Sequence, residues 1–215
     1  MLDTQYRMHK DICRFPSEEF YHGKLKTGPN LNYPRSAFCH RGSDCCSIIF
    51  GHIEGKEQYL MISTEEGNEN SRANLEEVEQ VVSNPGEGAF AYRWGGKPLQ
   101  EVQGSLSALI TWCNSLPLGS EWRYVIVSTV RSCPRSEIDK RPVKSWQKKY
   151  LGFVTDANQV NVCITRAQEG LCIIGNSFLL ESNLLWRRLL KHYKESRCYV
   201  VAGEVLVRRS SAAHR

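Results

Sequence analysis

The stretch DANQVNVCITRA at residues 156–167, followed by GLCII at residues 170–174, decides the fold of this chain. Asp156 is a residue type that caps helix N-termini, so we expect a helix that begins after it and runs through Ala167. Apolar residues recur at helical spacing on one face of this helix, at Val160, Cys163, Ile164 and Ala167. The apolar run that follows predicts a buried strand at Gly170–Ile174. A helix that leads into a buried strand is typical of an α/β protein.

The same alternation continues on both sides of this stretch. Trp122–Thr129 is apolar almost throughout its centre, so we expect a central strand that is covered on both faces. Helical spacing predicts a helix at Arg72–Val82, with Ser71 as its N-cap, and an amphipathic helix at Phe178–Tyr193. Other apolar runs predict strands at Cys46–Phe50, Tyr59–Ser63 and, at a sheet edge, Cys198–Ala202. The pattern indicates an α/β fold with a mostly parallel sheet flanked by helices.

The overall composition suits one ordinary domain. The chain has 215 residues, enough to bury a substantial core, and its net charge of +5 favours a polyanionic partner without requiring one. Its apolar runs fall well short of the roughly 20 residues that span a bilayer, so we expect no membrane partner. The first residues lack the apolar core of a signal peptide, which predicts a cytoplasmic or nuclear location.

The nine cysteines are scattered and mostly embedded in apolar runs, which favours reduced, buried thiols. Cys39, His40, Cys45 and Cys46 place four potential zinc ligands within eight residues. They lack the paired C-x2-C spacing of structural zinc sites, so we predict no metal site, and a zinc-binding domain stays an alternative.

Two arginines are the candidates for phosphate chemistry. Arg166 shares a helix face with Gln159 and Val162, away from the apolar stripe of the same predicted helix. Arg7 lies in QYRMH, residues 5–9, near the start of the chain. Planar guanidiniums suit the charge that develops on a transferring phosphoryl group. For Arg166, the alternative is a surface arginine paired with a nearby carboxylate.

Three longer motifs resemble one helicase family. LDTQYRMH at residues 2–9, FPSEEFY at residues 15–21 and VNVCITRA at residues 160–167 are similar to the second motor domain of Upf1-like superfamily 1 helicases. The resemblance implies a RecA-like, P-loop NTPase type of fold. It also implies that ATP, with Mg²⁺, binds in a cleft between this domain and a first RecA-like domain.

The resemblance assigns roles to five residues of that cleft. Arg7 and Arg166 occupy the positions that contribute catalytic arginines to the transferring phosphate. Tyr6 matches a tyrosine whose ring could pack on the nucleotide base or sugar, and the alternative is a core tyrosine. Gln5 belongs to the same nucleotide-binding motif. Glu121, just before the predicted central strand, matches a glutamate that accepts hydrogen bonds from ribose hydroxyls.

A second partner that the resemblance implies is single-stranded RNA or DNA, with RNA preferred. The segment STVRS, residues 128–132, resembles the family's SxVRS element and follows the central strand. Open α/β sheets bind ligands at the carboxyl ends of their strands, so Arg131 is a candidate nucleic-acid contact. The alternative is a structural arginine that closes a loop.

The chain also departs from the family pattern. A phosphate-cradling loop of the form G-x-x-x-x-G-K-[ST] and an acidic box for Mg²⁺ are absent from the sequence, so we expect the isolated chain to be inactive. Residues 84–118 diverge from the family pattern, and Leu118 stands in place of a family glutamine. This segment contains one predicted helix, Leu99–Asn114. Because a strand of the family is missing here, we expect a gap in the sheet. We therefore predict a RecA-like domain at residues 1–203 and a basic tail at 204–215.

The subgroup follows from two further runs. FGHIEG at residues 50–55 and STEEGNENSRAN at residues 63–74 resemble the helicase-with-zinc-finger proteins, which include a transcription co-activator. The resemblance predicts one half of an ATP-dependent helicase that is completed by a longer protein. The alternative is a truncated, non-catalytic module that binds nucleic acid or a protein.

Overall fold

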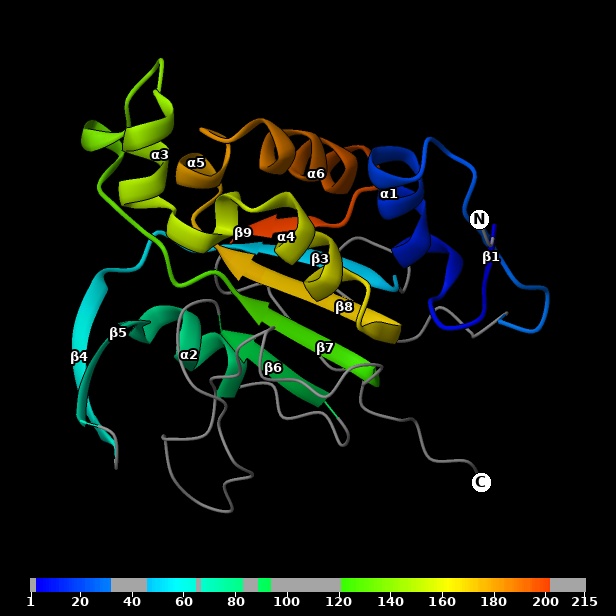
Figure 1. Ribbon diagram of the computed structural model, residues 1–215, viewed down its shortest axis with the longest axis horizontal. Helices are drawn as coiled ribbons and strands as arrows, with labels where there is room; N and C mark the ends of the chain where they lie inside the picture. The colour runs from blue at the N-terminus through cyan, green and yellow to red at the C-terminus, as the bar shows by residue number, and fades with distance from the viewer. Residues whose placement is uncertain (1–2, 32–45, 65–66, 83–88, 94–120, 202–215) are drawn as a thin grey trace.

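The centre of the molecule is a five-stranded sheet with the strand order β6-β7-β8-β3-β9 (Figure 1). The computed structural model describes residues 3–31, 46–64, 67–82, 89–93 and 121–201. Every strand pair in this sheet is parallel. The strands are β3 (Ile48–His52), β6 (Ala89–Arg93), β7 (Trp122–Ser128), β8 (Ala167–Gly175) and β9 (Tyr199–Val201). The predicted α/β fold with a mostly parallel sheet is confirmed.

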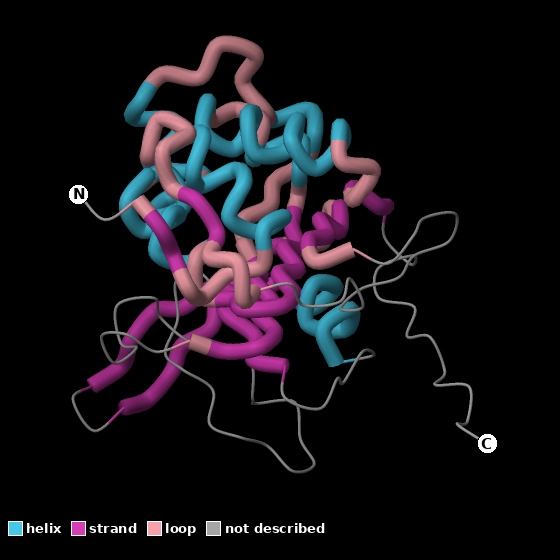
Figure 2. The backbone as a smooth tube through the Cα atoms, turned by 90° about the vertical axis from the view of Figure 1, so that its right-hand side faces the viewer, coloured by secondary structure: helices cyan, strands magenta, loops and turns pink. Residues whose placement is uncertain are grey.

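Helices cover both faces of this sheet (Figures 1 and 2). One face carries α1 (Lys10–Phe20), α4 (Ala157–Ile164), α5 (Ser177–Leu180) and α6 (Leu184–Glu195). The other face carries α2 (Leu75–Val82), which contacts β7. A third group, η1 (Arg135–Glu137), α3 (Lys144–Tyr150) and η2 (Gly152–Thr155), follows β7 in the chain. The result is the three-layer arrangement that parallel strands require, because both of their faces are apolar.

The core sits between the sheet and the helices of the larger layer. The side chains of Ile49, Phe50, Val125 and Ile173 are completely buried, as expected for central strands. From α6, the apolar stripe predicted by helical spacing is buried against them, at Leu185, Trp186, Leu189, Leu190 and Tyr193. The Trp186 indole Nε1 donates a hydrogen bond of 2.6 Å to the carbonyl of Val154, so a large polar ring is buried with its donor satisfied.

Two small sheets lie outside the central one. β1 (Thr4–Gln5) pairs in parallel with β2 (Lys26–Thr27). β4 (Glu57–Thr64) and β5 (Gly67–Asn74) form an antiparallel hairpin beside the sheet (Figure 1). The predicted strand at Tyr59–Ser63 therefore exists, but it belongs to this hairpin.

The predicted start of the helix at residue 72 is wrong, because residues up to Asn74 pair within the hairpin. The helix begins at Leu75, and Asn74 has the capping role that the sequence predicts for Ser71. Its side-chain oxygen accepts a hydrogen bond of 3.4 Å from the backbone N–H of Glu77. An asparagine before the first helical residue is a good N-cap, and the propensity of RANLEEVEQVV concealed the boundary.

Two other helix boundaries differ from the sequence prediction. α4 is capped by Asp156 as predicted, but it ends at Ile164, and Ala167 is the first residue of β8. The single helix predicted at Phe178–Tyr193 is two helices, each capped by an asparagine. Asn176 accepts from the N–H of Phe178 and Asn183 from that of Leu185. Asn183 therefore begins a second helix, three residues after the first helix ends at Leu180.

The predicted gap in the sheet is also wrong. β6 pairs with β7 in parallel, from Ala89 opposite Tyr124 to Arg93 opposite Ser128. The divergent segment therefore supplies the edge strand that the family pattern led us to consider missing. The predicted helix at Leu99–Asn114, Leu118 and the tail at 204–215 lie outside the described residues.

The cysteines that the structure describes are free thiols. Five are buried, Cys13, Cys46, Cys163, Cys172 and Cys198, which confirms the expectation of reduced, buried thiols for these positions. Cys39, His40 and Cys45 lie outside the described residues. Within residues 3–31, 46–64, 67–82, 89–93 and 121–201, His, Cys, Asp and Glu side chains form no group of three that could hold a metal ion. Over the same ranges, no helix is both long and apolar enough for a membrane span.

Candidate functional site

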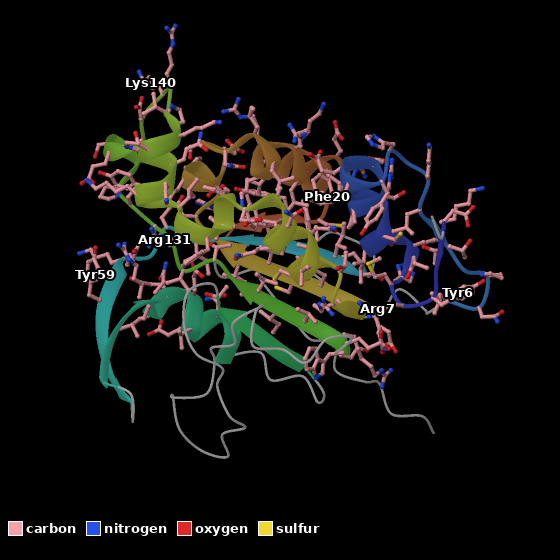
Figure 3. The ribbon with its side chains drawn as sticks, viewed as in Figure 1. Tyr6, Arg7, Phe20, Tyr59, Arg131 and Lys140 are labelled. Carbon is pink, nitrogen blue, oxygen red and sulfur yellow. The ribbon has the colours of Figure 1, made fainter. Side chains whose placement is uncertain are left out.

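The two arginine motifs meet at the end of the sheet where β7 and β8 begin, which we call the amino edge. The backbone N–H of His9 donates a hydrogen bond of 2.7 Å to the carbonyl of Gln168 at the start of β8. The Arg7 Nη1 donates to the carbonyl of Thr165 over 3.3 Å, between residues 158 positions apart in the sequence. Figure 3 places Tyr6 and Arg7 at this end of the molecule and Arg131 at the other.

Gln5 fixes the loop that carries Tyr6 and Arg7. Its Nε2 donates to the carbonyl of Met8 over 2.7 Å and to the hydroxyl of Thr27 over 2.8 Å. Its Oε1 accepts from the backbone N–H groups of Arg7, over 2.8 Å, and Met8, over 2.7 Å. The amide therefore uses both of its donors and both of its lone pairs inside the chain. Gln5 acts here by positioning its neighbours.

Arg7 is held from two sides at this edge. Its Nε donates to the Glu121 carboxylate Oε2 over 2.5 Å, in an ion pair whose side chains keep 30% and 40% of their surface exposed. The other oxygen of Glu121 accepts a hydrogen bond of 2.9 Å from the amide of Gln168. A carboxylate offers about four lone-pair sites, so Glu121 retains capacity for a further donor such as a hydroxyl. Arg7 is therefore oriented by a partner without being enclosed.

Arg166 follows the end of α4 and precedes β8 directly. Its Nε donates to the carbonyl of Val162 over 3.2 Å, which satisfies a carbonyl in the last turn of the helix. Its own carbonyl accepts from the N–H of Trp122, over 3.1 Å, so the turn is joined to the first residue of β7. Because Arg7 bonds the adjacent Thr165 carbonyl, both guanidiniums converge on one turn. The predicted core stripe of α4, Val160, Cys163 and Ile164, is buried.

Tyr6 is exposed, with 70% of its surface accessible, so the alternative of a core tyrosine is wrong. Its ring lies against the backbone of Gly28. A Cβ built on that glycine would lie 2.6 Å from Tyr6 Cδ1 and Cε1, so only glycine allows the ring to lie so close. The amino edge thus presents an exposed aromatic face on the same loop as Arg7.

Arg131 lies at the opposite end, beyond the last residue of β7, which we call the carboxyl edge. Its guanidinium donates to the carbonyls of Tyr150 and Lys149, each over 2.8 Å, and to the Glu57 carboxylate over 3.0 Å. Both side chains of this ion pair are nearly enclosed, at 11% and 10% exposed. Burial lowers the pKa of the Arg131 guanidinium, and the charge of Glu57 opposes that shift. This geometry favours the structural arginine that the sequence left open.

A buried carboxylate supports the same edge. Glu77 on α2 is completely buried, and it accepts hydrogen bonds from the hydroxyl of Ser128, over 2.5 Å, and from the N–H of Val130, over 2.9 Å. Val130 has a φ of 63°, a backbone conformation that costs a β-branched residue energy. The hydrogen bond from Val130 to Glu77 therefore stabilises the strained backbone turn that follows β7.

Sequence reasoning missed several residues of the amino edge. Thr165 and Gln168 contact Arg7 and Glu121, and Thr27 anchors Gln5. Thr165 lies inside the VNVCITRA motif, so its position gave a signal that we did not use. Gln168 and Thr27 gave none, because their roles depend on which strand ends meet in space.

Comparison with known proteins identifies the class. A family model described as an AAA domain matches residues 1–85 and 117–178, which together exceed half of the chain. The chain therefore belongs to the AAA domain family, and its relatives are Upf1-like superfamily 1 helicases.

Relatives with known names refine this picture. The chain is 52% identical over 227 residues to the 3'-5' exoribonuclease HELZ2 of Mus musculus and 48% identical over 223 residues to that of Homo sapiens. These alignments cover 99% and 96% of this chain but only 8% of each relative. The Regulator of nonsense transcripts 1 of Caenorhabditis elegans is 28% identical, over 90% of this chain and 18% of that protein. The chain thus spans a small part of the length of the relatives that it matches.

Proposed function

We propose that this chain is the second motor domain of an ATP-dependent helicase, with the ATP cleft at the amino edge. The observation that carries the proposal is the convergence of Arg7 and Arg166 on the turn at Thr165, with Tyr6 exposed beside them. Two guanidiniums and an aromatic face suit a nucleoside triphosphate, whose phosphates are anionic and whose base is flat.

The arginines would act on the transferring phosphate. Phosphoryl transfer depends on positioning and on fixed positive charge, since the protein performs little covalent chemistry. Arg166 is tied to α4 through the Val162 carbonyl, and Arg7 is oriented by Glu121 and the Thr165 carbonyl. Each guanidinium is thereby oriented before a phosphate arrives, which reduces the reorganisation that the reaction needs.

The remaining residues would bind the rest of the nucleotide. Tyr6 would pack on the base or sugar with its exposed ring. Glu121 would accept a ribose hydroxyl with the lone pairs that Arg7 and Gln168 leave available. Gln5 would contribute indirectly, because its four hydrogen bonds hold the Tyr6–Arg7 loop in place.

The first RecA-like domain of a longer protein would complete the cleft. The chain carries neither a phosphate-cradling loop nor an acidic box, so we propose that the other domain holds Mg²⁺ and the β- and γ-phosphates. Mg²⁺ there would neutralise charge on the transferring group.

Single-stranded nucleic acid is the second proposed partner. The chain's net charge of +5 suits a polyanion. RNA is favoured because the relatives from mouse and human are named exoribonucleases, a name that denotes action on RNA. From the sequence resemblance we also propose a cytoplasmic or nuclear location and, through the helicase-with-zinc-finger subgroup, a role as a transcription co-activator.

The test is the substitution Arg166→Ala in the complete protein. We expect nucleic-acid-stimulated ATP hydrolysis to fall by about 10³ to 10⁵, as for other transition-state arginines, with the fold intact by circular dichroism. The matched control is Arg123→Ala at the same edge, an exposed arginine that pairs with Glu169. Near-normal turnover of the Arg166 variant would refute the assignment. If wild-type complete protein hydrolyses no ATP, the non-catalytic interaction module replaces our proposal.

A further inference from the structure

A short segment beyond β7 concentrates the positive charge of this protein. Residues 134–150, which we call the basic lobe, contain η1 and α3 and carry six basic and two acidic residues, a net charge of +4. The whole chain has a net charge of +5. Figure 3 shows Lys140 at the outer tip of this lobe, with its side chain directed away from the fold.

The cations of the basic lobe form no ion pairs within the part of the chain that the structure describes, although Glu137 and Asp139 lie in the same segment. Arg135 lies over the ring of Phe178 at 3.9 Å, and Lys149 over that of Tyr150 at 5.2 Å. Among the described residues, the six form no ion pair with Asp or Glu: Arg135, Lys140, Arg141, Lys144, Lys148 and Lys149. All six are exposed.

The basic face of α6 shows what ordinary surface cations do in this protein. There Arg188 pairs with Glu19, Lys191 with Glu195 at 3.6 Å, and Lys194 with Glu181 at 2.5 Å. Paired cations present little net field to a ligand, whereas the six of the basic lobe add their fields together. The two basic surfaces therefore differ in their ability to attract a polyanion.

The inner side of the basic lobe is fixed to the domain. Ile138, Trp146 and Tyr150 pack against the core, and the rings of Trp146 and Tyr150 stack at 4.4 Å. Arg131 then binds the carbonyls of Lys149 and Tyr150 at the end of α3. The lobe is therefore held in place, with its apolar side inward and its cations outward.

Local stability explains only part of this charge. Lys148 and Lys149 lie in the last turn of α3, where cations interact favourably with the helix dipole. Lys144 is the first residue of that helix, where the dipole disfavours a cation. Lys144 and Lys148 also repel each other across one turn. Lys140 and Arg141 precede the helix, so the helix dipole does not explain their charges. An anionic binding partner explains them better.

We propose that the basic lobe binds the phosphate backbone of single-stranded nucleic acid. A group of exposed cations that is fixed to the domain can contact several phosphates of one strand, and backbone contacts of this kind carry no sequence preference. Arg131 is then a positioning residue, which holds the lobe through two carbonyls and does not touch the nucleic acid. This inference rests on the proposed function, because it gives the nucleic acid of that motor a surface on this domain.

The test is equilibrium binding of a fluorescein-labelled 20-nucleotide single-stranded RNA to the full 215-residue chain, from 50 to 200 mM salt. The variant Lys140→Gln/Lys144→Gln/Lys148→Gln removes three cations of the basic lobe. We expect it to lose about tenfold in affinity at 50 mM salt. The slope of log affinity against log salt should fall by about 2, because each lost phosphate contact on a single strand contributes about 0.7.

The matched control is Arg188→Gln/Lys191→Gln/Lys194→Gln on α6, which removes the same charge from the paired surface. Equal losses in both variants would show a general charge effect and overturn the proposal, as would wild-type affinity in the lobe variant. Polyglutamate of matched charge that displaces the RNA equally well would overturn it in favour of an acidic protein partner. No RNA binding by the wild-type chain would also overturn it. The proposed ATP cleft is tested separately, by the hydrolysis assay of the Arg166→Ala variant.

Discussion

The two ends of the central sheet each hold an arginine paired with a glutamate, and the pairs differ mainly in their access to water. At the amino edge, the Arg7 and Glu121 side chains are 30% and 40% exposed. At the carboxyl edge, the Arg131 and Glu57 side chains are 11% and 10% exposed. The Arg131 guanidinium also binds two backbone carbonyls, whereas that of Arg7 binds one.

Exposure decides what each pair can do. An exposed ion pair contributes about 0 to 1 kcal/mol, so it separates at little cost when a phosphate competes for the arginine. A buried pair is costly to break, because the remaining charge is left without compensation in a poorly hydrated site. The Arg7–Glu121 pair at the amino edge is thus suited to open when a ligand binds. The Arg131–Glu57 pair at the carboxyl edge is suited to stabilise the fold.

The largest expected effect is on catalysis at the amino edge. Arg7→Ala in the complete protein should lower nucleic-acid-stimulated ATP turnover by about 10³ or more, since a guanidinium near the transferring phosphate is lost. The melting temperature of the variant should stay close to that of the wild type, because the pair is exposed. A variant that keeps its turnover but melts at a much lower temperature would show that Arg7 has a structural role, as Arg131 does.

The next effect is on stability at the carboxyl edge. Arg131→Ala should lower the free energy of unfolding by about 3 kcal/mol, because Glu57 and two carbonyls lose their partner in a buried site. Glu57 also pairs with Arg72, which places the cost at the lower end of the range for buried pairs. Urea unfolding measures it, with Arg123→Ala as the exposed control. A loss below about 1 kcal/mol would mean that the carboxyl edge is no more structural than the amino edge.

A smaller effect is expected for the loop behind Arg7. Gln5→Ala removes four hydrogen bonds and should cost about 1 to 2 kcal/mol in unfolding free energy. Gln5→Glu retains the oxygen that accepts from Arg7 and Met8, and should recover part of that cost. Thermal unfolding of the two variants compares them. Equal melting temperatures for wild type and both variants would show that the loop needs no such anchor.

The smallest effect concerns the protonation of a thiol at the carboxyl edge. Burial, with the charges of Glu137 and Glu57, raises the pKa of Cys133 to about 11. The folded chain thus keeps this proton to a higher pH than the unfolded chain does, so this thiol's contribution to stability falls as pH rises from about 9 towards 11.

Glu137→Gln should increase the alkylation rate of Cys133 at pH 9 by about twofold, because one exposed charge is removed. Mass spectrometry of the Cys133 peptide measures the rate, with Asp139→Asn as the neighbouring control. An unchanged or lower rate would argue that these carboxylates do not influence the edge.

The sequence predicted the parts of the fold that depend on local pattern. The continuous apolar runs of β3, β7 and β8 identified buried strands, and Asp156 marked the start of α4 correctly. The errors fall where a distant contact overrides local propensity. Residues 72–74 resemble the start of a helix, yet they pair with β4, and the edge strand β6 became visible only through its pairing with β7.

The residues of the candidate site could be predicted from the sequence, but the contacts between them could not. The motifs named Arg7, Arg166 and Glu121, but no pattern indicates that Arg7 and Glu121 pair, because that contact depends on strand ends that meet in space. For Arg131 the sequence offered two interpretations of equal weight. Its three hydrogen bonds to Tyr150, Lys149 and Glu57 favour the structural one.

β7 runs from one edge of the molecule to the other, and its seven residues span about 23 Å. It is paired on both sides by parallel strands, and Val125–Val127 within it are almost completely buried. From Tyr124 to Ser128 this strand is rigid, since it can neither bend nor slip in register without breaking the pairing on both sides. The positions of the amino edge and of the carboxyl edge are therefore fixed relative to each other by this one strand.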